Sequence, residues 1–314
     1  MYLVFLFCYF IQCGSLNPFI SNGMLKYSQK YYSYEWMNYQ INYLEIKHEN
    51  PNKIPILFIH GLGASLYHFR DNIPELAKNS DVYAIDLLGF GRSDKPLINY
   101  NSSVWVNQIN DFIHAKIDSP CILVGNSIGA NLCLEATINN DNIVGTVLIN
   151  PAGKDDEILS IISDIISGNV ILTFLRNILF NIMFTRLNSR ETIQDLLLDI
   201  YTFNPSKVDN YLISSIYDPL ISIPEKEGRL IFEKINSNLA DIVLTKEVKG
   251  KILLLWGIED SWIDVSIVND LQNWYSDLQF VEIAGGHCCH DENSREVNTE
   301  IIKFCKNFYL STEL

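Results

Sequence analysis

The sequence is short of basic residues and of metal-ligand spacings, and each shortage argues against a class of function. Lys and Arg total 23 against 37 Asp and Glu among 314 residues, which leaves a net charge of −14. Such a field repels phosphate backbones and anionic membrane surfaces, so we expect no nucleic-acid partner. No C-x-x-C or H-x-x-x-H spacing occurs, and the adjacent Cys288 and Cys289 are poorly placed to bind one ion. We therefore expect neither a metal nor another cofactor.

Long apolar runs are also scarce, and the run at the N-terminus is a short one. Residues 2–11 are apolar, but a membrane-spanning helix needs about 20 residues. This start also lacks the positive charges of a secretory signal, so we expect a buried first segment or a peripheral membrane contact. The seven cysteines are odd in number and several lie inside expected strands or helices, which favours a reducing compartment. Nothing in the chain indicates a protein partner.

Strand and helix patterns alternate along most of the chain. The alternation of predicted strands with predicted helices is typical of an α/β protein with a mostly parallel, doubly wound sheet. The strands are expected at residues 40–48, 54–59, 82–85, 121–124, 143–149, 251–256 and 278–283. The helices are expected at residues 67–78, 103–117, 128–136 and 294–308.

One interval, residues 153–246, breaks this alternation. It contains apolar helical stretches at 158–166, 170–184 and 193–201 and no convincing buried strand. We interpret the interval as a helical cap, with a set of core helices as the alternative. Polar residues interrupt each long apolar stretch, which disfavours membrane insertion. The expected domains are an apolar extension (1–35), a core (36–152 and 247–314) and the inserted cap (153–246).

A candidate nucleophile lies where the strand at 121–124 meets the following helix. The sequence V-G-N-S-I-G-A places Ser127 between Gly125 and Gly129. A sharp strand-to-helix turn crowds the residues two before and two after the serine, so both must be small. The hydroxyl would then stand at a helix N-terminus, where developing negative charge is stabilised. A glycine-flanked surface turn is the alternative explanation of this short motif.

A serine hydroxyl needs an imidazole to accept its proton and a carboxylate to orient that imidazole. The strand at 251–256 leads into Asp260, and the last strand leads into His287. We predict Asp260 as the acid and His287 as the base. The rivals are His290 for the base and Glu259 or Asp264 for the acid.

The oxyanion of an acyl-transfer reaction needs two preorganised donors, one of which follows the nucleophile. That donor is the backbone N–H of Ile128, and the second is expected after the strand at 54–59. There Gly61 and Gly63 let the backbone approach the site, and Leu62 supplies the N–H by its position. We expect His60 to brace this loop rather than to transfer protons.

Together these motifs resemble the α/β-hydrolase-fold serine hydrolases, in particular the plastid and cyanobacterial branch that includes pheophytinase. The resemblance runs from Trp36 to Phe308. It is carried by I-H-G-L-G-A-S (59–65), H-F-R-D-N-I-P-E-L (68–76), V-Y-A-I-D-L-L-G-F-G-R-S-D-K-P (82–96), V-G-N-S-I-G (124–129), W-G-I-E-D-S-W (256–262) and G-H-C-C-H-D-E (286–292).

The resemblance implies hydrolysis of a carboxylic ester through an acyl-enzyme, and it implies a plastid location. The apolar cap favours a small hydrophobic ester as substrate, for which the branch suggests a phytyl-type ester. Carbon–carbon bond hydrolysis, acyl transfer and a ligand-binding receptor with little turnover are the alternatives. Epoxide hydrolysis is disfavoured, because the related epoxide hydrolases need aspartate at the position of Ser127.

Overall fold

The computed structural model describes residues 30–49, 53–152, 189–236 and 244–309. Within them, one sheet of eight strands has the order β1-β2-β4-β3-β5-β6-β7-β8. Strand β2 pairs antiparallel with β1 and β4, and all other neighbours are parallel. The strands are β1 Lys30–Trp36, β2 Tyr39–Ile46, β3 Ile56–Ile59, β4 Val82–Ile85, β5 Cys121–Asn126, β6 Ile143–Ile149, β7 Lys251–Gly257 and β8 Gln279–Ile283. The predicted mostly parallel sheet is confirmed.

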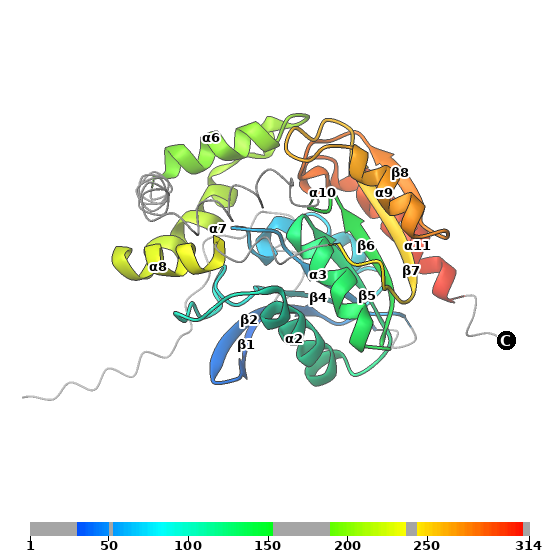
Figure 1. Cartoon of the computed structure of the whole chain (residues 1–314), viewed down its shortest axis with the longest axis horizontal. Helices are drawn as coiled ribbons and strands as arrows, with labels where there is room; N and C mark the ends of the chain where they lie inside the picture. Colours follow the sequence, from blue (N-terminus) through cyan, green and yellow to red (C-terminus); the bar gives the residue numbers. More distant parts are fainter. Residues whose placement is uncertain (1–29, 50–52, 153–188, 237–243, 310–314) are drawn as a thin grey trace, which may run out of the picture.

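Helices cover both faces of this sheet, because successive strand residues point to opposite sides. Leu57 and Ile59 pack with α2 and α3, whereas Ile56 and Phe58 pack with α1 and α11. Helix α9 packs beside α3 over β6 and β7 (Figure 1). The helices are α1 Ile73–Leu76, α2 Ser102–Phe112, α3 Ile128–Ala136, α6 Arg190–Ile200, α7 Asn210–Ile221, α8 Glu225–Asn236, α9 Ser266–Trp274, α10 Cys289–Glu292 and α11 Ser294–Tyr309. The 3₁₀ turns are η2 Leu66–Phe69, η4 Thr137–Asn139 and η5 Pro205–Lys207, and the π-helical segment is η3 Ile113–Ile117.

The sheet begins earlier than the sequence patterns predict. Strand β1 lies largely within the predicted 1–35 extension and pairs with β2 along its whole length. Its tyrosines explain the pairing, because aromatic side chains favour strands and Tyr32 stacks on Tyr43 at 5.3 Å between ring centroids. Residues 30–35 therefore belong to the sheet, and residues 1–29 of that extension lie outside the described residues.

A second difference concerns the helix predicted over residues 67–78. The segment forms the 3₁₀ turn η2 and, after a break, the short helix α1. Pro74 explains the break, because it has no N–H to donate to the carbonyl of Arg70 in a continuous helix. Arg70 lies in this break, as the C-cap of η2.

Between β6 and β7 the chain leaves the sheet and forms α6, α7 and α8, which lie together on one side of the molecule (Figure 1). No strand occurs among the described residues of this interval. Helices α6 and α7 share a small apolar cluster that includes Cys288, from the segment before α10. The predicted helices at 158–166 and 170–184 lie outside the described residues, and the boundaries at 153 and 246 stay predictions.

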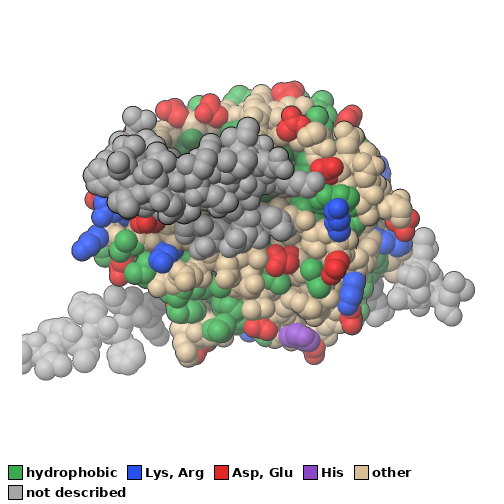
Figure 2. Space-filling model, viewed as in Figure 1, with side chains coloured by type: hydrophobic (Ala, Val, Ile, Leu, Met, Phe, Trp, Pro, Cys, Tyr) green, Lys and Arg blue, Asp and Glu red, His purple; other side chains and the backbone are tan. Residues whose placement is uncertain are grey.

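The acidic side chains are scattered on the one face of the molecule that Figure 2 shows. On the face seen in Figure 2, acidic side chains are spread over the described surface with basic ones between them. Among the described residues, no helix combines the length and the apolar character that crossing a bilayer requires.

Gly129 sits at a contact that admits no side chain. A Cβ there would lie 2.4 Å from the Ile59 carbonyl oxygen and 2.5 Å from that of His60, so Gly129→Ala must push α3 away from β3. We expect a loss of about 3 kcal/mol in the free energy of unfolding, measured by urea denaturation. Gly63→Ala is the control, since a Cβ there meets nothing within 4 Å. It should lose only about 1 kcal/mol through its φ of +69°. Equal losses in the two variants would contradict this packing argument.

Candidate active site

Ser127 occupies the sharp turn between β5 and α3. Its φ of 56° and ψ of −127° lie in a backbone region that residues other than glycine rarely adopt. The Ala130 N–H donates to the Ser127 carbonyl (2.9 Å) within the turn, and the Ser127 N–H donates to the Ile149 carbonyl on β6 (3.0 Å). A Cβ at Gly125 would lie 2.4 Å from the Gly129 carbonyl oxygen, so both predicted glycines are required by space.

The loop after β3 runs directly past this serine. A Cβ on Gly61 would lie 3.1 Å from the Ser127 Cβ, so the backbone of the loop packs against the elbow. Leu62 follows Gly61, which brings its peptide group close to Ser127. Ile128 is the first residue of α3, where a backbone N–H has no acceptor within the helix. Both N–H groups are therefore placed near the serine, and their role as the oxyanion hole stays a prediction.

His60 is buried beneath this loop with both ring nitrogens engaged. Its Nδ1 donates to the Gly61 carbonyl (2.7 Å), and its Nε2 accepts the N–H of Leu87 (3.0 Å). Burial lowers the pKa of His60, which keeps the ring neutral and suited to these two bonds. The contacts fit a bracing role, since the ring joins the loop after β3 to the loop after β4.

His287 and Asp260 lie in direct contact although they are far apart along the chain. The His287 Nδ1 donates to Asp260 Oδ2 at 2.8 Å, and both side chains are almost completely enclosed. Asp260 lies in the loop after β7, and His287 in the loop after β8. Because parallel strands end at the same edge of a sheet, the two loops emerge beside each other, at the edge where β5 also ends. The structure thus brings together the predicted acid and the predicted base.

Asp260 is held by several donors besides the histidine. Its Oδ1 accepts the N–H groups of Trp262 (2.8 Å) and Ile263 (3.1 Å), and its Oδ2 accepts the Asn150 side chain (2.7 Å). Burial acts to raise the pKa of Asp260, but the hydrogen bonds and the charge of His287 outweigh it and lower the pKa below its usual range. The carboxylate is therefore ionised and fixed in orientation at neutral pH.

Two asparagines that the sequence analysis missed join these parts. Asn150 donates to Asp260 and accepts the Gly257 N–H at 3.0 Å, so it ties the acid to the end of β7. Asn126 donates to the carbonyls of Ile149 (3.1 Å) and His287 (3.2 Å), which holds the histidine backbone beside the residue preceding Ser127. Both asparagines stand at carboxyl ends of parallel strands, and this position was the clue available in the sequence.

Trp262 is a third residue that the sequence analysis did not identify. Its ring stacks on the imidazole of His287, with centroids 5.9 Å apart and planes at 28°. The side chain remains 55% exposed. The indole therefore covers one face of the imidazole and presents apolar surface beside it.

The rival residues have other surroundings. The ring nitrogens of His290 are buried without a partner in the described structure, and its ring lies 4.9 Å from that of His68. Burial, followed by the neighbouring histidines and Arg70, keeps the pKa of His290 well below its usual value. Asp264 is exposed and accepts the Ser266 N–H. Among the described contacts, His290 has no carboxylate partner and Asp264 has no histidine partner.

Among the described residues, no group of His, Cys, Asp and Glu side chains has an arrangement that could hold a metal ion. The five cysteines in this part of the chain are free and buried, namely Cys121, Cys133, Cys288, Cys289 and Cys305. Burial raises the pKa of each of these thiols, which makes them unreactive.

A strained serine between a parallel strand and a helix, with a histidine–aspartate pair at the same sheet edge, defines an α/β protein built around a nucleophile elbow. The family model described as the alpha/beta hydrolase fold matches residues 54–294, and the chain belongs to this family.

Relatives and solved structures agree on this fold. The chain is 26% identical to epoxide hydrolase 3 of Xenopus tropicalis, over 81% of this chain and 72% of the relative. It is 31% identical to 2-hydroxymuconate semialdehyde hydrolase of Pseudomonas sp. (strain CF600), over 77% and 82%. It is 21% identical to chloroplastic pheophytinase of Arabidopsis thaliana, over 90% and 67%. The crystal structure of a serine hydrolase involved in carbazole degradation superposes with a TM-score of 0.69 at 21% identity, covering 91% of this chain and 100% of that one.

These comparisons support a coarse functional conclusion. The chain is a hydrolase of the α/β-hydrolase fold, and the distant similarity to pheophytinase agrees with the branch inferred from the motifs. These relatives are named for different substrates, so they do not define the bond that this protein cleaves.

Two of the candidate acids, Asp260 and Asp264, can be separated by parallel substitutions. Asp260→Asn should slow covalent labelling by a fluorophosphonate about 10⁴-fold, because the amide no longer stabilises a protonated His287. Asp264→Asn is the matched control and should label at the wild-type rate, because its carboxylate contacts Ser266 outside the pair. Labelling is followed by intact-protein mass spectrometry. An Asp260→Asn protein that folds and labels as fast as the wild type would contradict the assignment.

Proposed function

We propose that the protein is a serine hydrolase that cleaves a hydrophobic carboxylic ester through an acyl-enzyme on Ser127. The observation that carries the proposal is the 2.8 Å contact between His287 and Asp260 beside the strained serine turn. A serine in this conformation has little structural use, since the strain costs free energy, whereas an exposed hydroxyl at a helix N-terminus suits nucleophilic attack.

In the proposed reaction the Ser127 Oγ attacks the ester carbonyl while the Nε2 of His287 takes its proton. The negative oxygen that forms is held by the N–H groups of Leu62 and Ile128. When the carbon–oxygen bond breaks, the alcohol leaves with the proton from His287 and the acyl group remains on Ser127. Water then attacks the acyl group and gives a proton to His287, which returns it to the Ser127 Oγ as the acyl–oxygen bond breaks and the carboxylic acid is released.

Apolar side chains near these residues support a hydrophobic substrate. Trp262, stacked on His287, is 55% exposed, and Leu62, next to the glycine that packs on the serine, is 42% exposed. Each would lose water-accessible apolar surface on contact with an apolar acyl or alcohol group, which favours binding. We propose no nucleic-acid partner, because the net charge of −14 opposes one.

The motif resemblance and the pheophytinase relative make a phytyl-type ester the substrate candidate that we propose to test first. The same relative is named as chloroplastic, and we propose a plastid location on that ground. A long isoprenoid ester would reside in membranes, which is consistent with the peripheral membrane contact expected from residues 2–11.

Carbon–carbon bond hydrolysis is the second candidate, favoured by the 31% identity to 2-hydroxymuconate semialdehyde hydrolase. Epoxide hydrolysis is disfavoured despite the epoxide hydrolase relative, because that chemistry needs an aspartate where Ser127 stands. Acyl transfer to an alcohol and ligand binding with little turnover both remain compatible with the same residues.

A panel of p-nitrophenyl esters of increasing acyl length tests the proposal. We expect repeated turnover that favours the longer chains, and Ser127→Ala should reduce kcat by about 10⁶. The free energy of unfolding should change by less than about 0.5 kcal/mol, because the hydroxyl fills almost no core volume.

The panel, extended by β-diketone substrates and by an added alcohol, also tests the alternatives. One slow acylation without further turnover would contradict an ester hydrolase and favour a receptor. Turnover confined to β-diketone substrates would favour the carbon–carbon hydrolase. A new ester formed when an alcohol is added would identify a transferase.

A further inference from the structure

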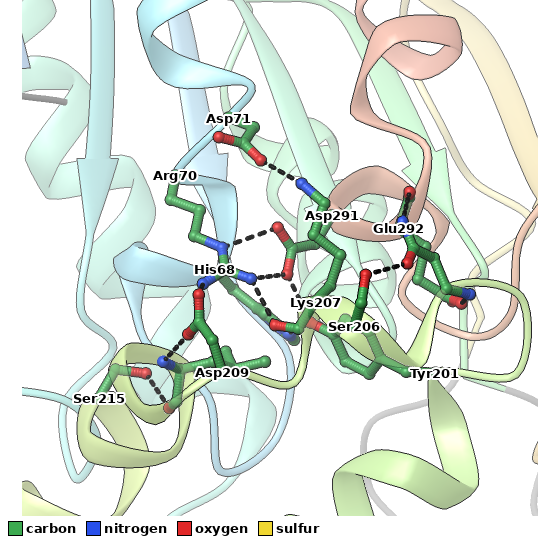
Figure 3. Close-up of polar contacts among 12 residues, drawn as sticks. His68, Arg70, Asp71, Tyr201, Ser206, Lys207, Asp209, Ser215, Asp291 and Glu292 are labelled. Atoms are coloured by element: carbon green, nitrogen blue, oxygen red, sulfur yellow. Dashed lines mark hydrogen bonds and ion pairs between the residues drawn. The ribbon is translucent and has the colours of Figure 1, made fainter. Parts of the chain in front are cut away.

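Arg70 is a buried arginine that connects three segments of the fold. Its side chain is 3% exposed, and its Nε and Nη2 each donate to one oxygen of Asp291, both at 2.9 Å. Its Nη2 also donates to the Lys207 carbonyl (2.7 Å), and its Nη1 donates to Asp209 (2.8 Å), which caps α7 (Figure 3). One guanidinium thus joins the loop after β3, helix α10 and the approach to α7.

A second chain of hydrogen bonds reaches the same carboxylate. Tyr201 is fully buried and its Oη donates to Asp291 Oδ2 at 2.9 Å (Figure 3). Burial, and then the charge of Arg70, lower the pKa of His68 to about 3, so the ring is neutral. Its Nε2 lies 2.7 Å from the Tyr201 Oη and donates to it. Asp291 therefore accepts from both Arg70 and Tyr201.

Further bonds join the same two regions along their backbones. We call residues 200–209 the cap strap and residues 286–292 the histidine segment. The Glu292 carboxylate accepts the N–H groups of Phe203 (2.8 Å) and Asn204 (2.9 Å) from the strap. Its other oxygen accepts the Gly286 N–H at 2.8 Å. The His287 N–H itself donates to the Ile200 carbonyl (3.2 Å).

These contacts flank the proposed base on both sides. His287 lies between Gly286, which is tied to Glu292, and Asp291, which is held by Arg70. Stability alone is a weak explanation for such a pair, because the cost of removing two charges from water offsets much of their attraction. The paired hydrogen bonds between Arg70 and Asp291 fix the orientation of the segment around the base, which an apolar pair could not do.

We propose that Arg70 and Asp291 are positioning residues. They hold the His287 imidazole in position relative to Ser127 and couple that position to the cap strap. The proposal rests on the proposed function for its kinetic test. The strap lies over the histidine segment, so a substrate that moves the strap also moves the base. Neither residue need touch the substrate, and their effect is on the chemical step rather than on binding.

The test uses the full chain carrying Arg70→Met, Arg70→Lys or Tyr201→Phe, assayed with p-nitrophenyl esters. We expect kcat to fall about 100-fold in Arg70→Met, since a shift of about 1 Å at a catalytic group can cost that much. KM should stay within about threefold. Arg70→Lys keeps the charge but loses the paired geometry, so it should recover only part of the rate. Tyr201→Phe, which removes one hydroxyl from the network, should show a smaller fall of the same kind.

Arg190→Met is the control, because Arg190 donates to Ser214 and Asp218 between α6 and α7 and has no described bond to the histidine segment. It should leave kcat unchanged. If Arg70→Met fails to fold, Arg70→Met combined with Asp291→Asn removes the unpaired buried charge and should restore the fold. A positioning role predicts that kcat stays low in this folded double variant.

The signal of His287 in ¹⁵N-histidine NMR spectra gives a readout that does not depend on turnover. It should shift in the Arg70 variants and stay in place in Arg190→Met. An unmoved signal, or a double variant that regains both the fold and kcat, overturns the proposal. An absence of ester turnover in the wild type would instead count against the proposed function, and the NMR comparison would still decide the coupling.

Discussion

The hydrogen bond between His287 and Asp260 is the contact on which the candidate site depends. It joins loops that follow different strands, and it is supported by donors from Asn150 and from the backbone after the aspartate. With the Nδ1 of His287 bound in this way, only its Nε2 is available to act on another group. The parallel sheet makes the contact possible, because β5, β7 and β8 present their carboxyl ends at one edge.

The helices of the interval predicted to be a cap are joined to this edge by polar contacts as well as by apolar packing. Residues of the strap bind the backbone and carboxylates of the segment that carries His287, while Cys288 packs into the apolar cluster of α6 and α7. The interval between β6 and β7 thus contacts the segment that carries the proposed base directly, through the bond from the His287 N–H to the Ile200 carbonyl and the bonds from the strap to Glu292.

Much of the sheet and the principal candidates were predictable, because their patterns are local. Helix α3 and strands β4 and β6 have the predicted bounds, since each is a run of mostly apolar residues with definite ends. Strand β1 was missed although Tyr32, Tyr34 and Trp36 alternate with polar residues, because the prediction assigned residues 1–35 as a whole to an apolar extension. Asn150 and the partners of Arg70 were missed for another reason, since Arg70 and Asp291 are 221 residues apart and only the folded sheet brings them together. The bond that is cleaved depends on the substrate, which no local pattern specifies.

The most direct test of this account is a crystal structure of the protein after reaction with a fluorophosphonate. The account predicts one adduct on the Ser127 Oγ, with the Nε2 of His287 at hydrogen-bonding distance, about 3 Å, from an oxygen of the adduct. It also predicts that the Nδ1 of His287 keeps its bond to Asp260. An adduct on another residue, or an imidazole turned away from Ser127, would contradict the central claim.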